Sequence, residues 1–241
     1  MINTKIPILM YHSIASMPKK TVMRSLHVPP RRFKFQMWIL KVLGYQALSL
    51  NKLKPYLDGQ KYGKVVGITF DDGYKNNLIN AAPVLVKYNF SATCYLVNKK
   101  IGLSNTWDLE KGITQSPLMN ENEIHEWLNL GMDIGAHTNN HPDLTSISEK
   151  KALKEIKDCK DELSKKFNVD VKDFCYPFGL YNKSIFNMVK DSGYLSASTM
   201  GRGRASIESN RYELPRIPIN HRTLPLLFLA KILTRYEDRR K

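Results

Sequence analysis

The sequence has no long uninterrupted hydrophobic run and few cysteines, and both absences exclude classes of protein. No apolar stretch approaches the roughly 20 residues that a membrane-spanning helix needs. The three cysteines are Cys94, Cys159 and Cys175, an odd number without the spacing of a metal site. They favour reduced thiols over a disulfide framework. We also find no internal repeat and no low-complexity tract, which argues against a repeat protein or a disordered chain.

The first residues lack a recognisable targeting signal. Residues 1–7 do not combine a basic region with a following apolar region and a small-residue cleavage site. From this we expect a cytoplasmic protein.

Acidic residues are in the minority. The chain has 37 Lys and Arg against 22 Asp and Glu, a formal net charge of +15. This excess favours an anionic partner, either an acidic membrane surface or an acidic or phosphorylated glycan, and the alternative is simply a solvated basic surface. The lysines are scattered and no nucleic-acid motif accompanies them, so we expect no nucleic-acid partner.

The length of 241 residues and the hydrophobic content of 42% fit one α/β domain, residues 1–241, with ample chain to bury a core. Short apolar runs predict strands, and amphipathic runs predict helices. The predicted strands are residues 6–14, 65–70, 91–97, 132–137, 173–179 and 195–200. The predicted helices are residues 33–43, 77–88, 121–129, 147–167, 184–190 and 224–233.

Two adjacent carboxylates, Asp71 and Asp72, follow the apolar β-branched run at residues 65–70. The run is typical of a buried parallel strand, and α/β folds place their chemistry where such strands end. One aspartate would hold a metal while its neighbour acts as a base, because two like charges this close need a cation or proton between them. The alternative is a turn followed by a helix N-cap.

Two histidines, His137 and His141, stand four residues apart after a second apolar stretch. On a helical turn, side chains at this spacing share one face and would converge on one ion. One aspartate and two histidines leave coordination positions open, as in a catalytic metal site.

Three motifs in order resemble those of the NodB-homology polysaccharide deacetylases, carbohydrate esterase family four. The motifs are Thr69-Phe70-Asp71-Asp72-Gly73, His137-Thr138-Asn139-Asn140-His141 and Tyr176-Pro177-Phe178-Gly179. The opening run that ends at His12 is similar to a subset with permuted motifs, the biofilm-exopolysaccharide deacetylases.

The resemblance implies a distorted (β/α) barrel that removes N-acetyl groups from a sugar. Asp72, His137 and His141 would hold a divalent metal, with zinc expected and cobalt, nickel or manganese left open. Asp71 would be the catalytic base. His12 would be the catalytic acid, with His221 as the less favoured alternative.

The third motif departs from the common family pattern, because Cys175 stands where many members carry an arginine that orients the catalytic aspartate. Arg216, in a late Leu-Pro-Arg-Ile segment, is our candidate to replace it. The resemblance also assigns oxyanion or substrate binding to Tyr176 and Phe178, while Trp107 and Asp108 are candidates to line a sugar-binding groove, the alternative for Trp107 being a packing role. Loss of the arginine leaves one rival reading, a catalytically silent carbohydrate-binding relative.

Residues 224–241 combine an apolar run with a basic tail. They predict a final core helix, or a segment that lies against an acidic membrane. We therefore expect an N-acetylated carbohydrate substrate, a glycan or a sugar linked to polyprenyl phosphate. It would be processed at the inner face of the membrane during surface polysaccharide or lipopolysaccharide synthesis.

Overall fold

The computed structural model describes residues 5–17 and 21–240. Residues 1–4, which belong to the N-terminal segment without a recognisable targeting signal, lie outside the described residues. Within them, eight strands form one sheet in which every pairing is parallel. The strands are β1 (Ile8–Tyr11), β2 (Gln46–Leu48), β3 (Val65–Phe70), β4 (Thr93–Leu96), β5 (Asp133–Ala136), β6 (Asp173–Cys175), β7 (Ser196–Arg202) and β8 (Leu214–Pro218).

The sheet closes into a barrel because β1 pairs with β8 on one side and with β3 on the other. Strand β3 is joined along its second edge by β4 near its carboxyl end and by β2 near its start, so β2 lies outside the ring. This is the (β/α) barrel expected from the resemblance. All carboxyl ends of the barrel strands therefore meet at one rim, where α/β barrels carry their functional loops.

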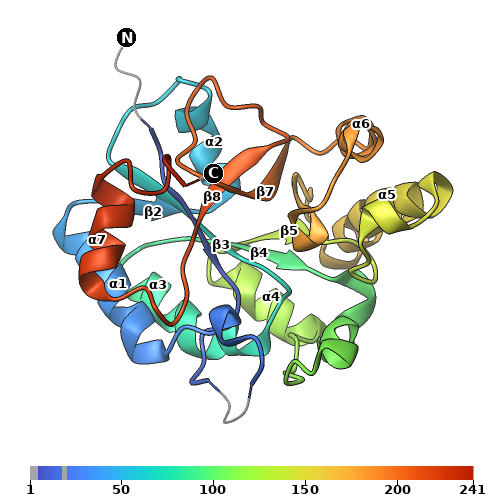
Figure 1. Cartoon of the computed structure of the whole chain (residues 1–241), viewed down its shortest axis with the longest axis horizontal. Helices are drawn as coiled ribbons and strands as arrows, with labels where there is room; N and C mark the ends of the chain where they lie inside the picture. The colour runs from blue at the N-terminus through green and yellow to red at the C-terminus, as the bar shows by residue number, and fades with distance from the viewer. Residues whose placement is uncertain (1–4, 18–20, 241) are drawn as a thin grey trace.

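Helices surround the barrel, as Figure 1 shows. They are α1 (Pro30–Val42), α2 (Leu50–Leu57), α3 (Ala82–Lys87), α4 (Glu121–Asn129), α5 (Glu149–Phe167), α6 (Lys183–Asp191) and α7 (Pro225–Leu233). A π-helical turn, Asn77–Ala81, leads into α3, and short 3₁₀ turns include Arg24–Leu26, Thr106–Lys111 and Pro177–Gly179. None of the helices in the described residues is long and apolar enough to cross a membrane.

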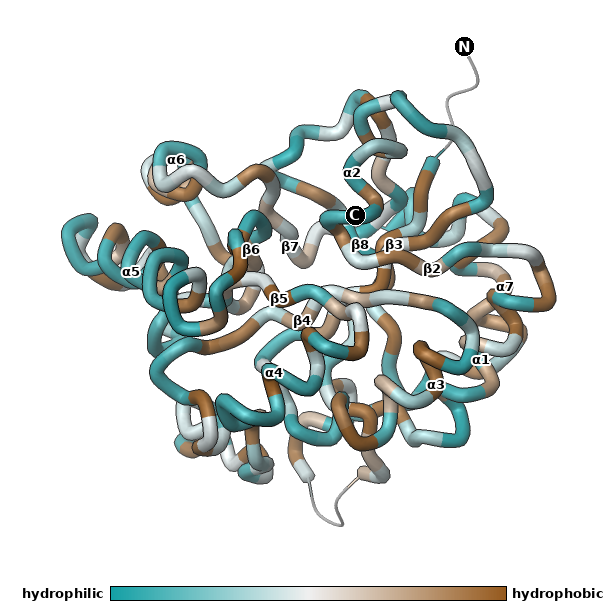
Figure 2. The backbone as a smooth tube through the Cα atoms, turned by 180° about the vertical axis from the view of Figure 1, so that it is seen from behind, coloured by the Kyte–Doolittle hydropathy of each residue, from teal (hydrophilic) through white to brown (hydrophobic). Residues whose placement is uncertain are grey.

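The core lies between the strands and the inward faces of the helices. Strands β1, β3 and β4 are buried along their whole length, which explains why their sequences are mostly apolar. Hydrophobic residues concentrate in the central strands, whereas the outlying helix α5 alternates between hydrophobic and hydrophilic residues (Figure 2). Only one side of α5 packs on the core, so its charged side faces solvent.

Most predicted elements form, and β3 and α4 keep their predicted bounds. The expected first strand was too long, since β1 ends at Tyr11, before His12. Strands β2 and β8 and helix α2 were not predicted. Strand β2 has only three residues, β8 contains two prolines, which are unusual inside a sheet, and α2 contains Pro55, which normally interrupts helices. The apolar run near the C-terminus is α7, which buries Phe228 and Ile232.

Candidate active site

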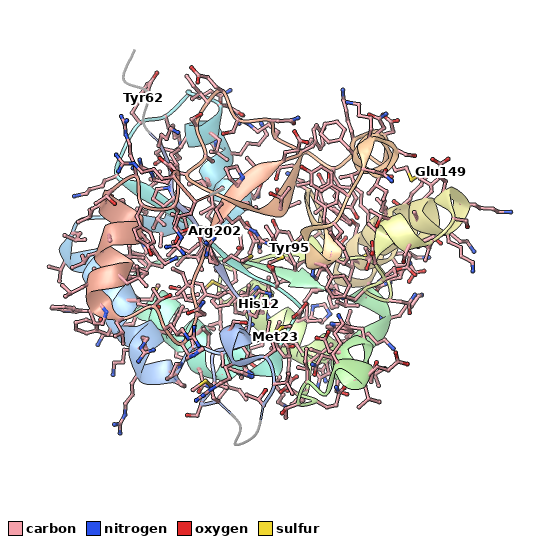
Figure 3. All side chains as sticks on the ribbon, viewed as in Figure 1. His12, Met23, Tyr62, Tyr95, Glu149 and Arg202 are labelled. Carbon is pink, nitrogen blue, oxygen red and sulfur yellow. The ribbon has the colours of Figure 1, made fainter. Side chains whose placement is uncertain are left out.

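A cavity of about 360 Å³ opens at the rim formed by the carboxyl ends of the strands. The candidate site residues from the sequence all line it: His12, Asp71, Asp72, Trp107, His137, His141, Tyr176, Phe178 and Arg216. They come from segments far apart in the sequence, which the barrel brings together. His12 and Met23, both in the cavity wall, lie near one another in Figure 3.

Three donor atoms from Asp72, His137 and His141 converge in this cavity. Asp72 Oδ1 lies 3.5 Å from Nε2 of His137 and 3.5 Å from Nε2 of His141. The two Nε2 atoms are 3.1 Å apart, and all three side chains are buried. Among the described residues this is the group of His, Cys, Asp or Glu with the geometry to hold a metal ion.

The loop that carries the two histidines is not a helical turn, so that part of the sequence argument was wrong. Thr138 and His141 adopt left-handed backbone angles, φ 67° and φ 61°. The Thr138 hydroxyl accepts a hydrogen bond of 2.9 Å from the His141 amide, which closes the turn. A β-branched residue in this conformation is strained, and such strain clusters at functional sites.

The electrostatics of the three residues suit a cation. His137 Nδ1 lies 2.7 Å from the Cys175 carbonyl oxygen and donates to it, which directs Nε2 toward Asp72 and His141. Burial opposes protonation of His137, but the neighbouring Cys175 and Asp72 outweigh it and raise the pKa of His137, so a bound metal would take the place of the Nε2 proton. Burial and the neighbouring His137 lower the pKa of His141 to about 3, so its imidazole is neutral. Burial opposes ionisation of Asp72, but the two imidazoles outweigh it and hold the pKa of Asp72 below its usual range. Two imidazoles and one carboxylate therefore fit a divalent metal of the zinc type.

Asp71 and Arg216 form a bidentate ion pair. Arg216 Nη1 lies 2.6 Å from Asp71 Oδ1, and Nη2 lies 2.8 Å from Oδ2. Burial opposes ionisation of Asp71, but the guanidinium outweighs it and holds the pKa of that carboxyl below its usual range. Cys175 Sγ lies 3.2 Å from Nη2, so the thiol sits beside the pair where the family arginine would come from.

His12 faces Asp71 across the cavity. Its Nε2 is 3.8 Å from Asp71 Oδ2, and part of its side chain is open to solvent. Asn77 Nδ2 donates to the His12 carbonyl over 2.8 Å, which fixes the chain where β1 ends. The alternative acid, His221, is not among the residues that line the cavity.

Aromatic rings enclose His141 on two sides. The Trp107 ring stacks on it with centroids 4.6 Å apart and an interplanar angle of 23°. Phe178, in a left-handed conformation at φ 57°, meets it edge-on at 4.6 Å. The Tyr176 hydroxyl donates to the Tyr212 carbonyl over 3.1 Å, so that group is already engaged.

Sequence reasoning did not identify Lys111 or the 3₁₀ turn Arg24–Leu26 as parts of the cavity. Lys111 Nζ lies 4.0 Å from the Phe178 ring centroid and 3.4 Å from Asp108 Oδ1. Asp108 is buried, and burial together with the nearby Asp72 raises its pKa. Lys111 and Asp108 belong to the irregular segment 99–120, whose path no local sequence pattern fixes. The length of this segment without predicted structure, together with the candidate Trp107 inside it, was its functional signal.

Known proteins resemble this chain over most of its length. The sequence profile of the polysaccharide deacetylase family matches residues 58–197. The Bacillus subtilis protein YxkH is 32% identical over 218 residues, which cover 90% of this chain and 72% of YxkH. The poly-β-1,6-N-acetyl-D-glucosamine N-deacetylase of Staphylococcus epidermidis is 27% identical over 82% of this chain and 70% of its own. The structure of the Streptococcus pyogenes deacetylase PplD in complex with acetate matches with a TM-score of 0.81 and 30% identity, covering 95% of this chain and 99% of that one.

Proposed function

The chain belongs to the polysaccharide deacetylase family of NodB homology, and we propose that it is a metal-dependent enzyme that hydrolyses the N-acetyl group of an N-acetylated sugar. The observation that carries the proposal is the single cavity in which Asp72, His137 and His141 converge beside Asp71 and His12.

The three converging residues would hold a divalent metal, zinc in the first instance, with cobalt, nickel or manganese as alternatives. When bound, such an ion supplies Lewis acidity toward the acetamide carbonyl and lowers the pKa of water. Neutral Nε2 atoms on both histidines and an ionised Asp72 are the protonation states that ligation requires.

Asp71 and His12 would handle the protons. Asp71, kept ionised by Arg216, takes a proton from water while the water oxygen bonds to the carbonyl carbon. The carbon–nitrogen bond then breaks, and His12 gives a proton to the departing sugar nitrogen. The backbone N–H near Phe178 would stabilise the negative charge on the former carbonyl oxygen. The products are acetate and an amino sugar.

The relatives support an N-acetylated glycan as substrate. The Staphylococcus epidermidis relative is named for N-acetylglucosamine polymer deacetylation, and the Streptococcus pyogenes relative was solved with acetate, which this reaction would release. We extend the proposal to N-acetylated sugars on a polyprenyl-phosphate carrier in surface polysaccharide or lipopolysaccharide synthesis. The cytoplasmic location at the inner membrane face stays a prediction.

The rival reading, a silent carbohydrate-binding relative, depended on the missing motif arginine. The contact between Arg216 and Asp71 removes that support, because the aspartate has a buried cationic partner from another strand.

The test combines amine release from N-acetylated oligosaccharides with metal analysis. We expect Asp71→Asn to abolish turnover while metal remains bound, and His137→Ala to lose both. Full activity of Asp71→Asn would refute the assignment of the base. Unmodified protein that binds no divalent metal and releases no amine would overturn the proposed function.

A further inference from the structure

One side of the barrel is formed by α1, α3 with its preceding π-helical turn, and α7, here called the cationic flank. Helix α1 contacts both α3 and the π-helical turn. Gln36 Nε2, on α1, donates over 3.3 Å to the Thr223 carbonyl just before α7, and Arg32 donates to the His221 carbonyl. Figures 1 and 2, from opposite sides, both show α1, α3 and α7 as neighbours, on the side away from α5.

Large apolar side chains remain exposed along this flank. On α1, Phe35 is 42% exposed and Trp38 is 46% exposed, and their rings stack with centroids 5.2 Å apart. On α7, Leu226 is 82% exposed. The exposed set on the flank is Phe35, Trp38, Val42, Ile79, Val86, Leu224, Leu226 and Leu233. Scattered single residues of this kind are ordinary, but a group on adjoining helices marks an interaction surface.

The flank also has no acidic residue in any of its helices. The first Asp or Glu of the sequence is Asp58, and none occurs in residues 73–107 or 214–236. The same helices and the residues flanking α7 carry exposed basic residues: Arg31, Lys34, Lys41, Lys87, Arg222 and Arg235. Helix α5, across the barrel, carries acids of its own: Glu149, Glu155, Asp158, Asp161 and Glu162.

We propose that the cationic flank binds the surface of an anionic lipid bilayer. Aromatic and leucine side chains would enter the headgroup boundary, and lysines and arginines would meet the lipid phosphates. Two copies of the chain joined face to face through this flank would place like charges opposite one another. A nucleic acid would neutralise the lysines and arginines but leave the leucine side chains exposed to water. An anionic bilayer would neutralise the cations and also bury the apolar side chains. This inference is independent of the proposed catalytic activity.

The test measures tryptophan fluorescence of the full chain with vesicles that carry brominated acyl chains. Trp38 is the exposed tryptophan, because Trp127 is fully buried and Trp107 stacks on His141. We expect quenching by vesicles that contain phosphatidylglycerol and none by pure phosphatidylcholine vesicles. Trp38→Phe should lose the quenching but still sediment with the vesicles. No quenching by anionic vesicles, or equal quenching by both kinds, would overturn the proposal.

Two pairs of variants make the test specific. Lys34→Glu with Lys41→Glu should weaken vesicle binding at least about tenfold, since each cation near an acidic surface contributes about 1 kcal/mol. The matched control, Lys150→Glu with Lys157→Glu on α5, makes the same charge change and should bind as the unmodified chain does. Phe35→Ser should weaken binding, and Leu153→Ser, 42% exposed on α5, should not.

Equal losses in the flank and α5 variants would show that only net charge matters and would overturn the proposal. So would RNA binding that competes with the vesicles, or a dimer in lipid-free solution that depends on Trp38. The measurements need no sugar substrate, so a failure here and a failure of the deacetylase activity are separate results.

Discussion

At the scale of single residues, Asp71 depends on a partner 145 positions away in the sequence. A buried carboxylate tends to stay protonated, and the two-pronged contact with Arg216 reverses that tendency. Cys175 stands where the resemblance places the arginine of many family members; its thiol lies beside the pair, and its carbonyl oxygen accepts from His137. The orienting cation therefore reaches Asp71 from β8.

Arg216→Lys should lower kcat by about 10²-fold and leave KM and metal content nearly unchanged. Lysine keeps the charge but loses the planar fork that fixes both carboxylate oxygens, and misplacement of a catalytic group is costly. Steady-state amine release and metal analysis measure the two effects. Arg222→Lys, on an exposed residue, is the control. An unchanged kcat in Arg216→Lys would show that Asp71 needs no orienting fork.

Asp108→Asn should raise KM about tenfold or more and change kcat little. Asp108 lines the cavity, and its carboxylate can accept a hydrogen bond from a sugar hydroxyl, a charged interaction of about 1.5–3 kcal/mol. A substrate that lacks that hydroxyl should lose affinity for the unmodified enzyme and no further affinity for the variant. Glu110→Gln, on the exposed side of the same segment, is the control. A fall in kcat at constant KM would point to a different role for Asp108.

Residue type and spacing were enough to single out His137 and His141 together with one of the two adjacent aspartates, and the family resemblance assigned the ligand role to Asp72. The sequence could not give the true backbone of the histidine loop, where Thr138 accepts from the His141 amide. Nor could it identify Lys111, because its contact with the Phe178 ring depends on how a long loop folds back.

At the scale of elements, the start of one helix fixes the end of one strand. The side-chain amides of Asn76 and Asn77, at the start of the helical run after β3, contact the residues that follow β1. Asn76 Oδ1 accepts a hydrogen bond from the Ile14 backbone amide over 2.8 Å. Asn77 binds the His12 carbonyl from the same turn. The helix predicted over residues 77–88 forms as the π-helical turn Asn77–Ala81 followed by α3, and the sequence pattern did not distinguish the π-helical turn from an α-helix.

Strand and helix prediction succeeded where an element is long and periodic or continuously apolar, as in β3 and α5. It failed for β2, which forms because Gln46, Ala47 and Leu48 pair with the first half of β3. Such a three-residue strand has almost no pattern of its own, so tertiary pairing decides it.

Gly135→Ala should destabilise the fold by about 1–3 kcal/mol, as overpacking of a close-packed core does. A Cβ at this position in β5 would come within 2.5 Å of the Tyr95 ring and 2.9 Å of the Asp173 carbonyl oxygen. Urea unfolding measures the change. Gly63→Ala, where the nearest atom would be 3.4 Å away, is the control and should have little effect. Equal stability of both variants would mean that β5 shifts without cost.

At the scale of the whole molecule, the two ends of the barrel shift the pKa values of buried carboxyl groups in opposite directions. At the rim that carries the cavity, Arg216 and the imidazoles keep Asp71 and Asp72 ionised. At the opposite end, Asp173 begins β6 and is buried with one strong donor, the Ser196 hydroxyl at 2.6 Å. Burial raises the pKa of Asp173 to about 6, the Ser196 hydrogen bond opposes the rise, and the nearby Asp133 adds to it.

Asp173→Asn should therefore stabilise the protein at pH 7.5. A carboxyl whose pKa is about 6 in the folded state, against 3.8 as its ordinary value, binds protons more tightly when folded. Above pH 6, ionisation of Asp173 therefore lowers the free energy of unfolding by its full amount. This loss becomes smaller as the pH falls toward 4. At about 1.4 kcal/mol per pKa unit, the variant should gain about 2–3 kcal/mol at pH 7.5 and progressively less toward pH 4.

Urea unfolding at pH 7.5 and at pH 4.5 separates this cost from a change in packing, because asparagine has the same shape and can still accept from the Ser196 hydroxyl. Asp170→Asn is the matched control, since Asp170 lies near the same end of the barrel with its side chain 66% exposed. If Asp173→Asn raises the free energy of unfolding by the same amount at both pH values, the gain comes from packing and not from the loss of the charge. A loss at pH 7.5 would mean that Lys54 and Lys172 stabilise the ionised carboxylate by more than burial costs it.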